Sequence, residues 1–247
     1  MEHPSPASFE RYADAIVALP ERDEFNKTDL LVPQFQLFKD QNLEIYYAPF
    51  DFINTQAKVA IVGITPGWTQ MEIAFRQART ALRNGLTISA ALQEAKGKAS
   101  FAGTMRKNLV SMLDETRLQK ALGLESCDSM FGNSDRFLHT TSAIRYPAFV
   151  LGRNYTGHSP RLLSTPVLAR FVEQVLAPEL SLLPEALVVP LGKCVDAVLR
   201  SLIQVGVLKA KICLLGFPHP SGTNGHRRTE FEQGRNMFIQ IIDGWAN

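Results

Sequence analysis

The chain has 247 residues, of which 45% are hydrophobic and 20% are charged. These values are typical of a globular protein with a full core, and a chain of this length can form one domain. No apolar run approaches the length of a membrane span, and the N-terminus lacks the pattern of a signal peptide. The three cysteines have no CxxC spacing, which argues against a disulfide framework and against a zinc or iron–sulfur site. We therefore expect a cytoplasmic protein with one domain over residues 1–247, without cofactor, metal or membrane partner.

The net charge at pH 7 is +2, but it is unevenly distributed along the chain. Residues 1–58 hold 5 Lys and Arg against 10 Asp and Glu, a net charge of −5, so residues 59–247 carry +7. Residues 136–172 contain five arginines and no acidic residue. Because clustered cations can neutralise phosphates, this distribution favours a nucleic-acid-binding surface. A solvated basic surface is the alternative.

The first elements are predicted from the spacing of apolar residues. This spacing predicts a helix over 8–20 and an extended piece around 43–47. Residues 1–58 contain too few apolar residues for a core of their own, so we expect them to form a leading helix and a wrap-around segment. The apolar run 59–62 is then the first predicted core strand, and it opens the core that we expect over 59–247.

Short apolar runs and helical patterns alternate along the rest of the chain. Further strands are predicted over 137–144, 186–191 and 211–215. Helices are predicted over 70–96 (divided in two near Gly85), 104–113, 167–176, 193–205 and 230–246. This alternation is typical of a mostly parallel sheet flanked by helices. We predict an α/β fold of three layers, α/β/α, around a central, mostly parallel sheet of four strands.

Two segments join an apolar run to a loop rich in glycine and proline. Residues 59–67 read VAIVGITPG, and residues 212–222 read ICLLGFPHPSG. Ligands bind at the carboxyl ends of the strands in open α/β sheets, so two such loops could face one cleft. In their order and separation, the GITPG and HPS motifs resemble the two active-site motifs of the uracil-DNA glycosylase superfamily.

The resemblance extends over roughly residues 57–240. The segment FAGTMRKNL at 101–109 is similar to the family segment whose phenylalanine stacks on the extracted base. The segment LHTTSAIR at 138–145 resembles a strand that ends in an asparagine reading the base edge, and Ser142 stands at that place here. The resemblance implies the uracil-DNA glycosylase-like fold. The cysteines that bind an iron–sulfur cluster in the thermostable branch are missing from this chain.

The resemblance also implies roles for individual residues. A neutral His219 would donate a hydrogen bond to a carbonyl oxygen of the leaving base, and Thr65 would orient the attacking water. The implied base-binding residues are Gly63, Ile64, Pro66, Gly67, Phe101 and Ser142. The expected DNA contacts are Ser221, Gly222, Asn224, Arg227, Arg145 and Arg161. If the fold is right, the loops with Gly63–Gly67, Phe101, Ser142 and His219 should converge on one cleft.

Three departures from the family pattern affect the expected chemistry. Thr65 replaces the Asp or Asn of active members and cannot serve as a base at neutral pH. Gly67 stands where uracil-restricted enzymes carry a bulky tyrosine, so a roomier pocket is expected. Ser142 lacks the two-way hydrogen bonding of an amide. Each position also has a plain structural alternative: His219 as a loop residue that caps a helix, Phe101 as a core aromatic, and the glycines as an ordinary turn.

The sequence thus predicts a hydrolase of base excision repair. It is expected to be a monomeric, monofunctional DNA glycosylase that flips a damaged or mismatched, uracil-type base out of duplex or single-stranded DNA and hydrolyses its N-glycosidic bond. It is expected to be monofunctional because no lysine or N-terminal amine is placed to form a Schiff base. The alternative is a catalytically weak or inactive nucleic-acid-binding member of the same fold. A small-molecule α/β hydrolase is disfavoured, because the chain has no GxSxG motif.

Overall fold

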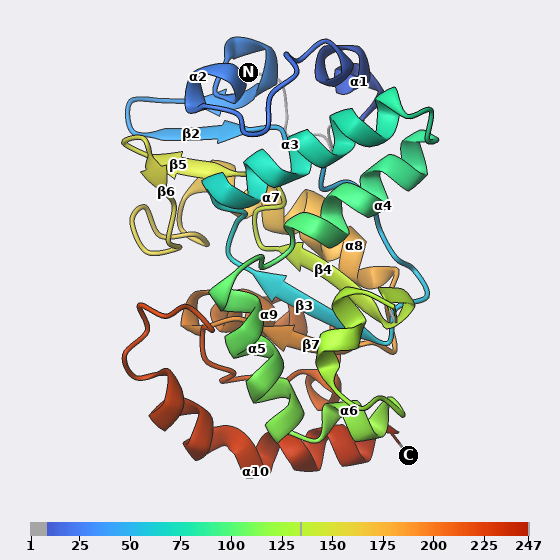
Figure 1. Cartoon of the computed structure of the whole chain (residues 1–247). Coiled ribbons are helices and arrows are strands. Elements are labelled where there is room, and N and C mark those ends of the chain that lie inside the picture. Colours follow the sequence, from blue (N-terminus) through green and yellow to red (C-terminus); the bar gives the residue numbers. More distant parts are fainter. Residues whose placement is uncertain (1–8, 134, 247) are drawn as a thin grey trace. The chain divides into compact units, whose positions relative to one another are not determined.

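A computed structural model describes residues 9–133 and 135–246 (Figure 1). The chain is divided into two compact units, each assembled from three separate stretches. Unit 1 comprises Met1–Ile53, Thr65–Ser100 and Ile144–Leu176, and unit 2 comprises Asn54–Ile64, Phe101–Ala143 and Ala177–Asn247. The chain passes between the units within the GITPG motif, since Gly63 and Ile64 belong to unit 2 and Thr65 begins the next stretch of unit 1.

Unit 1 combines helices with an antiparallel sheet in the order β1-β2-β5-β6. Its strands are β1 (Gln36–Lys39), β2 (Leu43–Tyr46), β5 (Ala148–Val150) and β6 (Arg153–Asn154). Its helices are α1 (Glu10–Val17), α2 (Lys27–Leu30), α3 (Trp68–Arg83), α4 (Ile88–Ala99) and α7 (Pro166–Phe171), the last continuing into a π-helical turn over Val172–Leu176. The extended piece and the two helices divided near Gly85 are confirmed. The helix expected over 8–20 is also confirmed, although position 8 lies outside the described residues.

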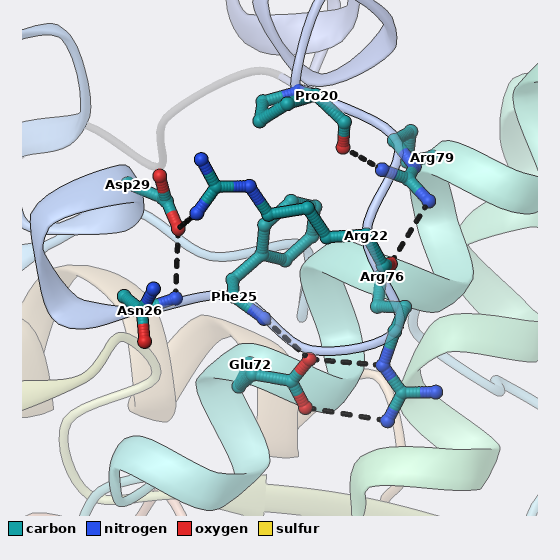
Figure 2. Close-up of polar contacts among 8 residues, drawn as sticks. All are labelled: Pro20, Arg22, Phe25, Asn26, Asp29, Glu72, Arg76 and Arg79. Carbon is teal, nitrogen blue, oxygen red and sulfur yellow. Dashed lines mark hydrogen bonds and ion pairs between the residues drawn. The ribbon is translucent and has the colours of Figure 1, made fainter.

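Residues 20–29 are tied to α3 by side chains of that helix (Figure 2). The guanidinium of Arg79 donates to the carbonyl oxygens of Pro20 and Arg22. Glu72 accepts a hydrogen bond from the backbone N–H of Phe25 at 3.3 Å and forms an ion pair with Arg76 at 2.9 Å. Glu72 and Arg79 are both buried, so their bonds to the backbone satisfy groups that would otherwise lose their hydration.

Unit 2 contains a parallel sheet in the order β4-β3-β7. The strands are β3 (Val59–Gly63), β4 (Leu138–Ser142) and β7 (Leu187–Pro190), and Val59 pairs with both Leu138 and Leu187. The helices are α5 (Thr104–Glu115), α6 (Leu118–Ala121), α8 (Ala177–Ser181), α9 (Lys193–Gln204) and α10 (Arg227–Ala246). Strands expected over 59–62, 137–144 and 186–191 are confirmed, as are the helices expected over 104–113, 193–205 and 230–246.

The fourth strand expected over 211–215 is wrong. Ala210–Ile212 forms a 3-10 helix, and only Cys213 continues beside the sheet, through an isolated parallel bridge to Val188. Gly216 then adopts φ +89°, and the N–H of Phe217 turns back to the carbonyl oxygen of Leu214. An apolar run of this length indicates that the segment is buried, but a buried segment can be irregular and need not be a strand. The described sheet therefore has three strands where we expect four.

The two faces of the unit 2 sheet pack differently, because alternate strand residues point to opposite sides. One face joins α5 and α10 in a single hydrophobic cluster that includes Val59, Ile61, Leu138, Leu109, Met112, Phe231 and Phe238. On the other face, His139 and Thr141 contact Glu179 of α8. The protein is thus a mixed α/β protein with a parallel sheet. No helix in the described part of the chain is long and apolar enough to cross a membrane.

Candidate functional site

Gly63, Ser142 and Phe101 meet at the carboxyl end of the unit 2 sheet. Gly63 pairs with Ser142, and a Cβ atom at position 63 would lie 3.2 Å from Ser142 Oγ and 3.3 Å from Phe101 Cε1. A side chain at position 63 would therefore require Ser142 or Phe101 to shift by a few tenths of an ångström. Ser142 Oγ has no hydrogen-bond partner among residues 9–133 and 135–246, and it is not one of the fully buried unsatisfied atoms. Ser142 is only 8% exposed, but its hydroxyl oxygen is not fully enclosed and has no described partner.

Phe101 lies at this edge but is buried. It is 6% exposed and belongs to the hydrophobic cluster of unit 2. Its φ of +53° is unusual for a bulky residue, so the surrounding structure must hold this backbone conformation. Ring atoms Cε1 and Cζ lie nearest Gly63, and little of the ring is exposed in this conformation. The stacking role implied by the resemblance therefore has no accessible surface here, and the alternative of a core aromatic fits the burial.

The loop that carries His219 begins beside β7 and is held there by two backbone contacts. The N–H of Gly192 donates to the carbonyl oxygen of Phe217 at 3.0 Å, and the N–H of Gly216 donates to Asp196 Oδ1 at 2.6 Å. His219 packs directly on Gly192, because a Cβ atom there would lie 2.9 Å from His219 Cβ. His219 is thus fixed at the carboxyl edge of the same sheet as Ser142.

Three side chains hold the other half of the loop. Asn108 Nδ2 donates to the carbonyl oxygen of Pro220 at 2.9 Å. Asn224 Nδ2 donates to that of His219 at 3.3 Å, and Arg227 Nη1 to that of Ser221 at 2.8 Å. Asn224 and Arg227, which we expect to contact DNA, therefore both support the loop; Asn224 Nδ2 is fully engaged, also bonding Glu230 Oε2 at 3.4 Å, whereas Nε and Nη2 of Arg227 have no described partner. Gly222 is exposed, and the Ser221 hydroxyl lies 2.8 Å from that of Thr223.

The imidazole of His219 has one nitrogen engaged and one available. The N–H of Ser221 donates to Nδ1 at 3.2 Å, so the proton of the neutral ring is on Nε2. Burial lowers the pKa of His219, which keeps the ring neutral at pH 7. No residue that the structure describes accepts a hydrogen bond from Nε2. Through Nδ1 the ring supports its own loop, while Nε2 is left without a described partner.

The two available groups flank β3. Ser142 ends β4 on one side, and Gly192, on which His219 packs, follows β7 on the other. Neighbouring strands are about 4.8 Å apart, so the ends of β4 and β7 are separated by about 10 Å. Between them lies Gly63, which has no side chain, followed by the half-buried Ile64. A hydroxyl and a neutral N–H donor are thus placed on the two sides of a bare glycine.

The second half of the GITPG motif belongs to unit 1. Thr65 Oγ1 donates to the carbonyl oxygen of Tyr146 at 2.8 Å and accepts from the N–H of Ala148 at 3.1 Å. Its donor is therefore in use, and one lone pair remains to accept a hydrogen bond from a water. Pro66 is buried, and Gly67 caps α3, with its N–H bonded to Gln70 Oε1 at 3.1 Å.

The arginines expected to contact DNA differ in exposure. Arg145, expected to contact DNA, is only 6% exposed and interacts electrostatically with Asp51, so it is not accessible to a DNA backbone in this conformation. Arg161 is exposed, as are Arg153 and Arg170, and none of these three side chains pairs with another described residue. Four of the five arginines of the basic stretch are therefore exposed: Arg153, Arg161 and Arg170 in unit 1, and Arg136 in unit 2.

Sequence reasoning misses a polar cluster around Asp51 in unit 1. Its carboxylate accepts hydrogen bonds from Tyr47 Oη at 2.8 Å and Tyr146 Oη at 2.6 Å. Burial raises the pKa of Asp51, whereas the two hydroxyls and the nearby Arg145 and Lys96 oppose that rise. These residues are far apart in the sequence, so no local pattern could reveal the cluster.

A second unexpected network lies on β4 of unit 2. His139 Nε2 is 2.8 Å from Glu179 Oε1, and Thr141 Oγ1 donates to Glu179 Oε2 at 3.0 Å. The N–H of Asn54 donates to His139 Nδ1 at 3.3 Å, which places the imidazole proton on the nitrogen facing Glu179. All three side chains are buried and bonded to one another, so the network supports β4 from the face opposite Ser142.

The cysteines take no part in the candidate site. Cys127 and Cys213 are buried, and burial raises the pKa of the Cys213 thiol to about 11. Their thiols are therefore protonated at pH 7 and are poor nucleophiles. Among the residues with a described position, no group of three or more His, Cys, Asp or Glu side chains is arranged to hold a metal ion.

Fold and site define a mixed α/β protein whose parallel sheet presents a glycine, a serine hydroxyl and a neutral histidine at its carboxyl edge. The chain is 39% identical to the uncharacterized protein YoxB of Bacillus subtilis (strain 168) over 237 residues, which are 95% of this chain and 92% of YoxB. The chain therefore belongs to the family of YoxB. No protein-family model matches the chain, and no solved structure matches it.

Proposed function

We propose that the protein is a monofunctional DNA glycosylase, a member of the uracil-DNA glycosylase superfamily that hydrolyses the N-glycosidic bond of a uracil-type damaged or mismatched base. One observation carries the proposal. Ser142 Oγ and His219 Nε2, on the two sides of Gly63 at the carboxyl edge of one parallel sheet, are both without a partner in the described chain. Polar groups left without partners at the carboxyl edge of a parallel sheet are typical of a ligand site.

The chemistry of base release suits a neutral histidine. When the glycosidic bond breaks, its electron pair moves to the base, which leaves as an anion, while water adds to the sugar carbon and releases a proton that the base takes up directly or through solvent. The Nε2–H of His219 would stabilise the negative charge on a carbonyl oxygen of that base. Because Gly192, Asn108 and Asn224 fix the loop backbone, little reorganisation would accompany the step. The Ser142 hydroxyl would bond to the edge of the base.

The finer architecture is part of the proposal. Helices pack on both faces of the β4-β3-β7 sheet, which supports a three-layer arrangement like that of uracil-DNA glycosylases. DNA is the proposed partner, because Arg153, Arg161 and Arg170 are exposed and without partners in the part of the chain that is described. We propose that the protein acts as a cytoplasmic monomer.

A nucleic-acid-binding protein with little or no catalysis is the second candidate function. Two observations favour it. The Thr65 hydroxyl donates to the Tyr146 carbonyl oxygen and cannot act as a base, and the Phe101 ring is buried. On this proposal the exposed arginines would bind phosphates, and no base would be released.

One experiment separates the two candidates. Stoichiometric enzyme is incubated with oligonucleotides carrying uracil, hypoxanthine, xanthine or a thymine opposite guanine, and abasic sites are then cleaved with alkali. A glycosylase gives strand breaks with at least one lesion. Binding that weakens between about 50 and 200 mM salt, without strand breaks, supports the second candidate. Affinity that does not change with salt, together with intact strands, contradicts both.

A further inference from the structure

The hairpin of β5 and β6 (yellow in Figure 1) ends in an exposed leucine. Leu151 is 73% exposed, more than any other large hydrophobic residue in the described chain. Its backbone is nevertheless fixed: Val150 pairs with Arg153, and the N–H of Leu151 donates to the carbonyl oxygen of Asn42 at 2.8 Å. The hairpin therefore presents this apolar side chain to solvent from a defined position.

The turn itself is unfavourable for leucine. Leu151 has φ +49° and Gly152 has φ +71°, the pattern of a two-residue type I′ turn. Asn-Gly is the preferred sequence for such a turn, because asparagine tolerates positive φ better than leucine does. Leucine at this position is thus disfavoured by its backbone conformation and by its exposure. A contact made outside the folded chain would offset both.

Two cations flank the leucine. Lys27 Nζ donates to the carbonyl oxygen of Gly152 at 3.0 Å, and Arg153 is exposed without a partner in the described residues. The acidic side chain of the adjoining β1–β2 turn, Asp40, is already bonded to the N–H groups of Asn42 and Leu43. The tip therefore combines one apolar side chain with two neighbouring positive charges.

We infer that this tip is a DNA wedge: Leu151 inserts between neighbouring base pairs while Lys27 and Arg153 contact the flanking phosphates. Apolar side chains inserted at a base step unstack it, and lysine and arginine neutralise the backbone around the step. The inference rests on the proposed function in taking DNA as the partner. It assigns to unit 1 a contact with the duplex that the base-binding edge of unit 2 does not provide.

The test uses duplex DNA with a 2-aminopurine, whose fluorescence rises when the base is unstacked. Wild-type protein should bind the duplex and raise the fluorescence. Leu151→Asn should weaken binding about tenfold and abolish the rise, while its melting temperature stays equal or increases because asparagine suits the turn. Val205→Asn is the matched control, since Val205 is 70% exposed elsewhere and should leave binding unchanged. Arg153→Ala should reduce the salt slope by about one and keep the fluorescence rise.

The outcomes separate the wedge from the proposed function. Wild-type protein that binds no DNA overturns both. Wild-type protein that binds DNA, with Leu151→Asn equal to it in affinity and fluorescence, overturns the wedge and leaves the proposed function standing. Loss of self-association in Leu151→Asn, with DNA binding intact, would also overturn the wedge by assigning the tip to a second copy of the chain.

Discussion

The loop of His219 in unit 2 and the turn of Thr65 in unit 1 are built in opposite ways. In the His219 loop, neighbouring groups bond to the backbone, and one side-chain nitrogen remains without a described partner. In the Thr65 turn, the side chain itself bonds to the backbone, at Tyr146 and Ala148. Similar glycine- and proline-rich sequences therefore place their polar residues differently. His219 also bonds to its own loop, through Nδ1, but its Nε2–H donor has no described partner, whereas the single donor of Thr65 is in use.

Among the variants that test this comparison, Gly192→Ala should have the largest effect on stability and on base release. The added Cβ would lie 2.9 Å from His219 Cβ, at a residue with φ +87°. We expect a loss of about 3 kcal/mol in the free energy of unfolding and a base-release rate lowered at least about 100-fold. Denaturant unfolding and single-turnover kinetics measure the two effects. Gly206→Ala is the control, because Gly206 has φ +79° with no described atom within 4 Å of the added Cβ. Equal losses in both variants would show that backbone strain alone is responsible and that His219 is not displaced.

Thr65→Val tests the supporting role of threonine. Valine keeps the shape but leaves the Tyr146 carbonyl oxygen and the Ala148 N–H without their partner, so the free energy of unfolding should fall by about 1–3 kcal/mol. Thr65→Ser keeps the hydroxyl and should lose less. Denaturant unfolding of the three proteins is the measurement. A Thr65→Val protein as stable as wild type would contradict this role.

Asp196→Ala should loosen the His219 loop and lower the base-release rate less than Gly192→Ala does. It removes the acceptor of the Gly216 N–H, bonded at 2.6 Å, and we expect a base-release rate about tenfold lower. Asp196→Asn retains an acceptor oxygen and should restore most of the rate. Arg200→Ala removes only the exposed ion pair with Asp196 and should change stability by less than about 0.5 kcal/mol. If Arg200→Ala lowers the rate as much as Asp196→Ala, the ion pair and not the Gly216 bond fixes the loop.

The smallest predicted effect is a pH dependence of stability. Burial lowers the pKa of His219 in the folded state below its ordinary value of about 6.5, so the unfolded chain binds more protons in that range. The His219 contribution to the free energy of unfolding should be fully present above pH 6.5 and should decrease as the pH falls below it. Comparing wild type with His219→Asn from pH 8 to pH 5 isolates this contribution. A contribution that grows as the pH falls would contradict the assigned neutral ring.

Much of unit 2 follows from its sequence. The apolar runs at 59–62, 137–144 and 186–191 form parallel strands, and a connection containing at least one helix joins each strand to the next in the chain. The run at 211–215 is as apolar, but the chain turns away at Gly216 after one bridge. The antiparallel sheet of unit 1 is largely missed, because its strands are short and its Leu151–Gly152 turn lacks the Asn-Gly signal.

The sequence predicts only those parts of the candidate site whose positions are fixed by the pairing of the strands. Gly63 and Ser142 lie together because the carboxyl ends of adjacent parallel strands share an edge. The side chains of Asp196 and Asn108 hold the His219 loop through hydrogen bonds to backbone groups that are distant in the sequence, and no local pattern reveals such bonds. The burial of Arg145 likewise depends on Asp51, a residue 94 positions away in the chain.

The central claim is that the Nε2–H of His219 acts on the departing base. Single-turnover base release by wild type, His219→Ala and His226→Ala, on whichever lesion oligonucleotide is cleaved, tests this claim most directly. His226 is exposed and lies in the same loop region, so its replacement controls for general effects on that segment. We expect His219→Ala to lower the rate by about 100-fold to 1,000-fold, with His226→Ala close to wild type. A His219→Ala protein that is folded and releases the base at the wild-type rate would contradict the claim.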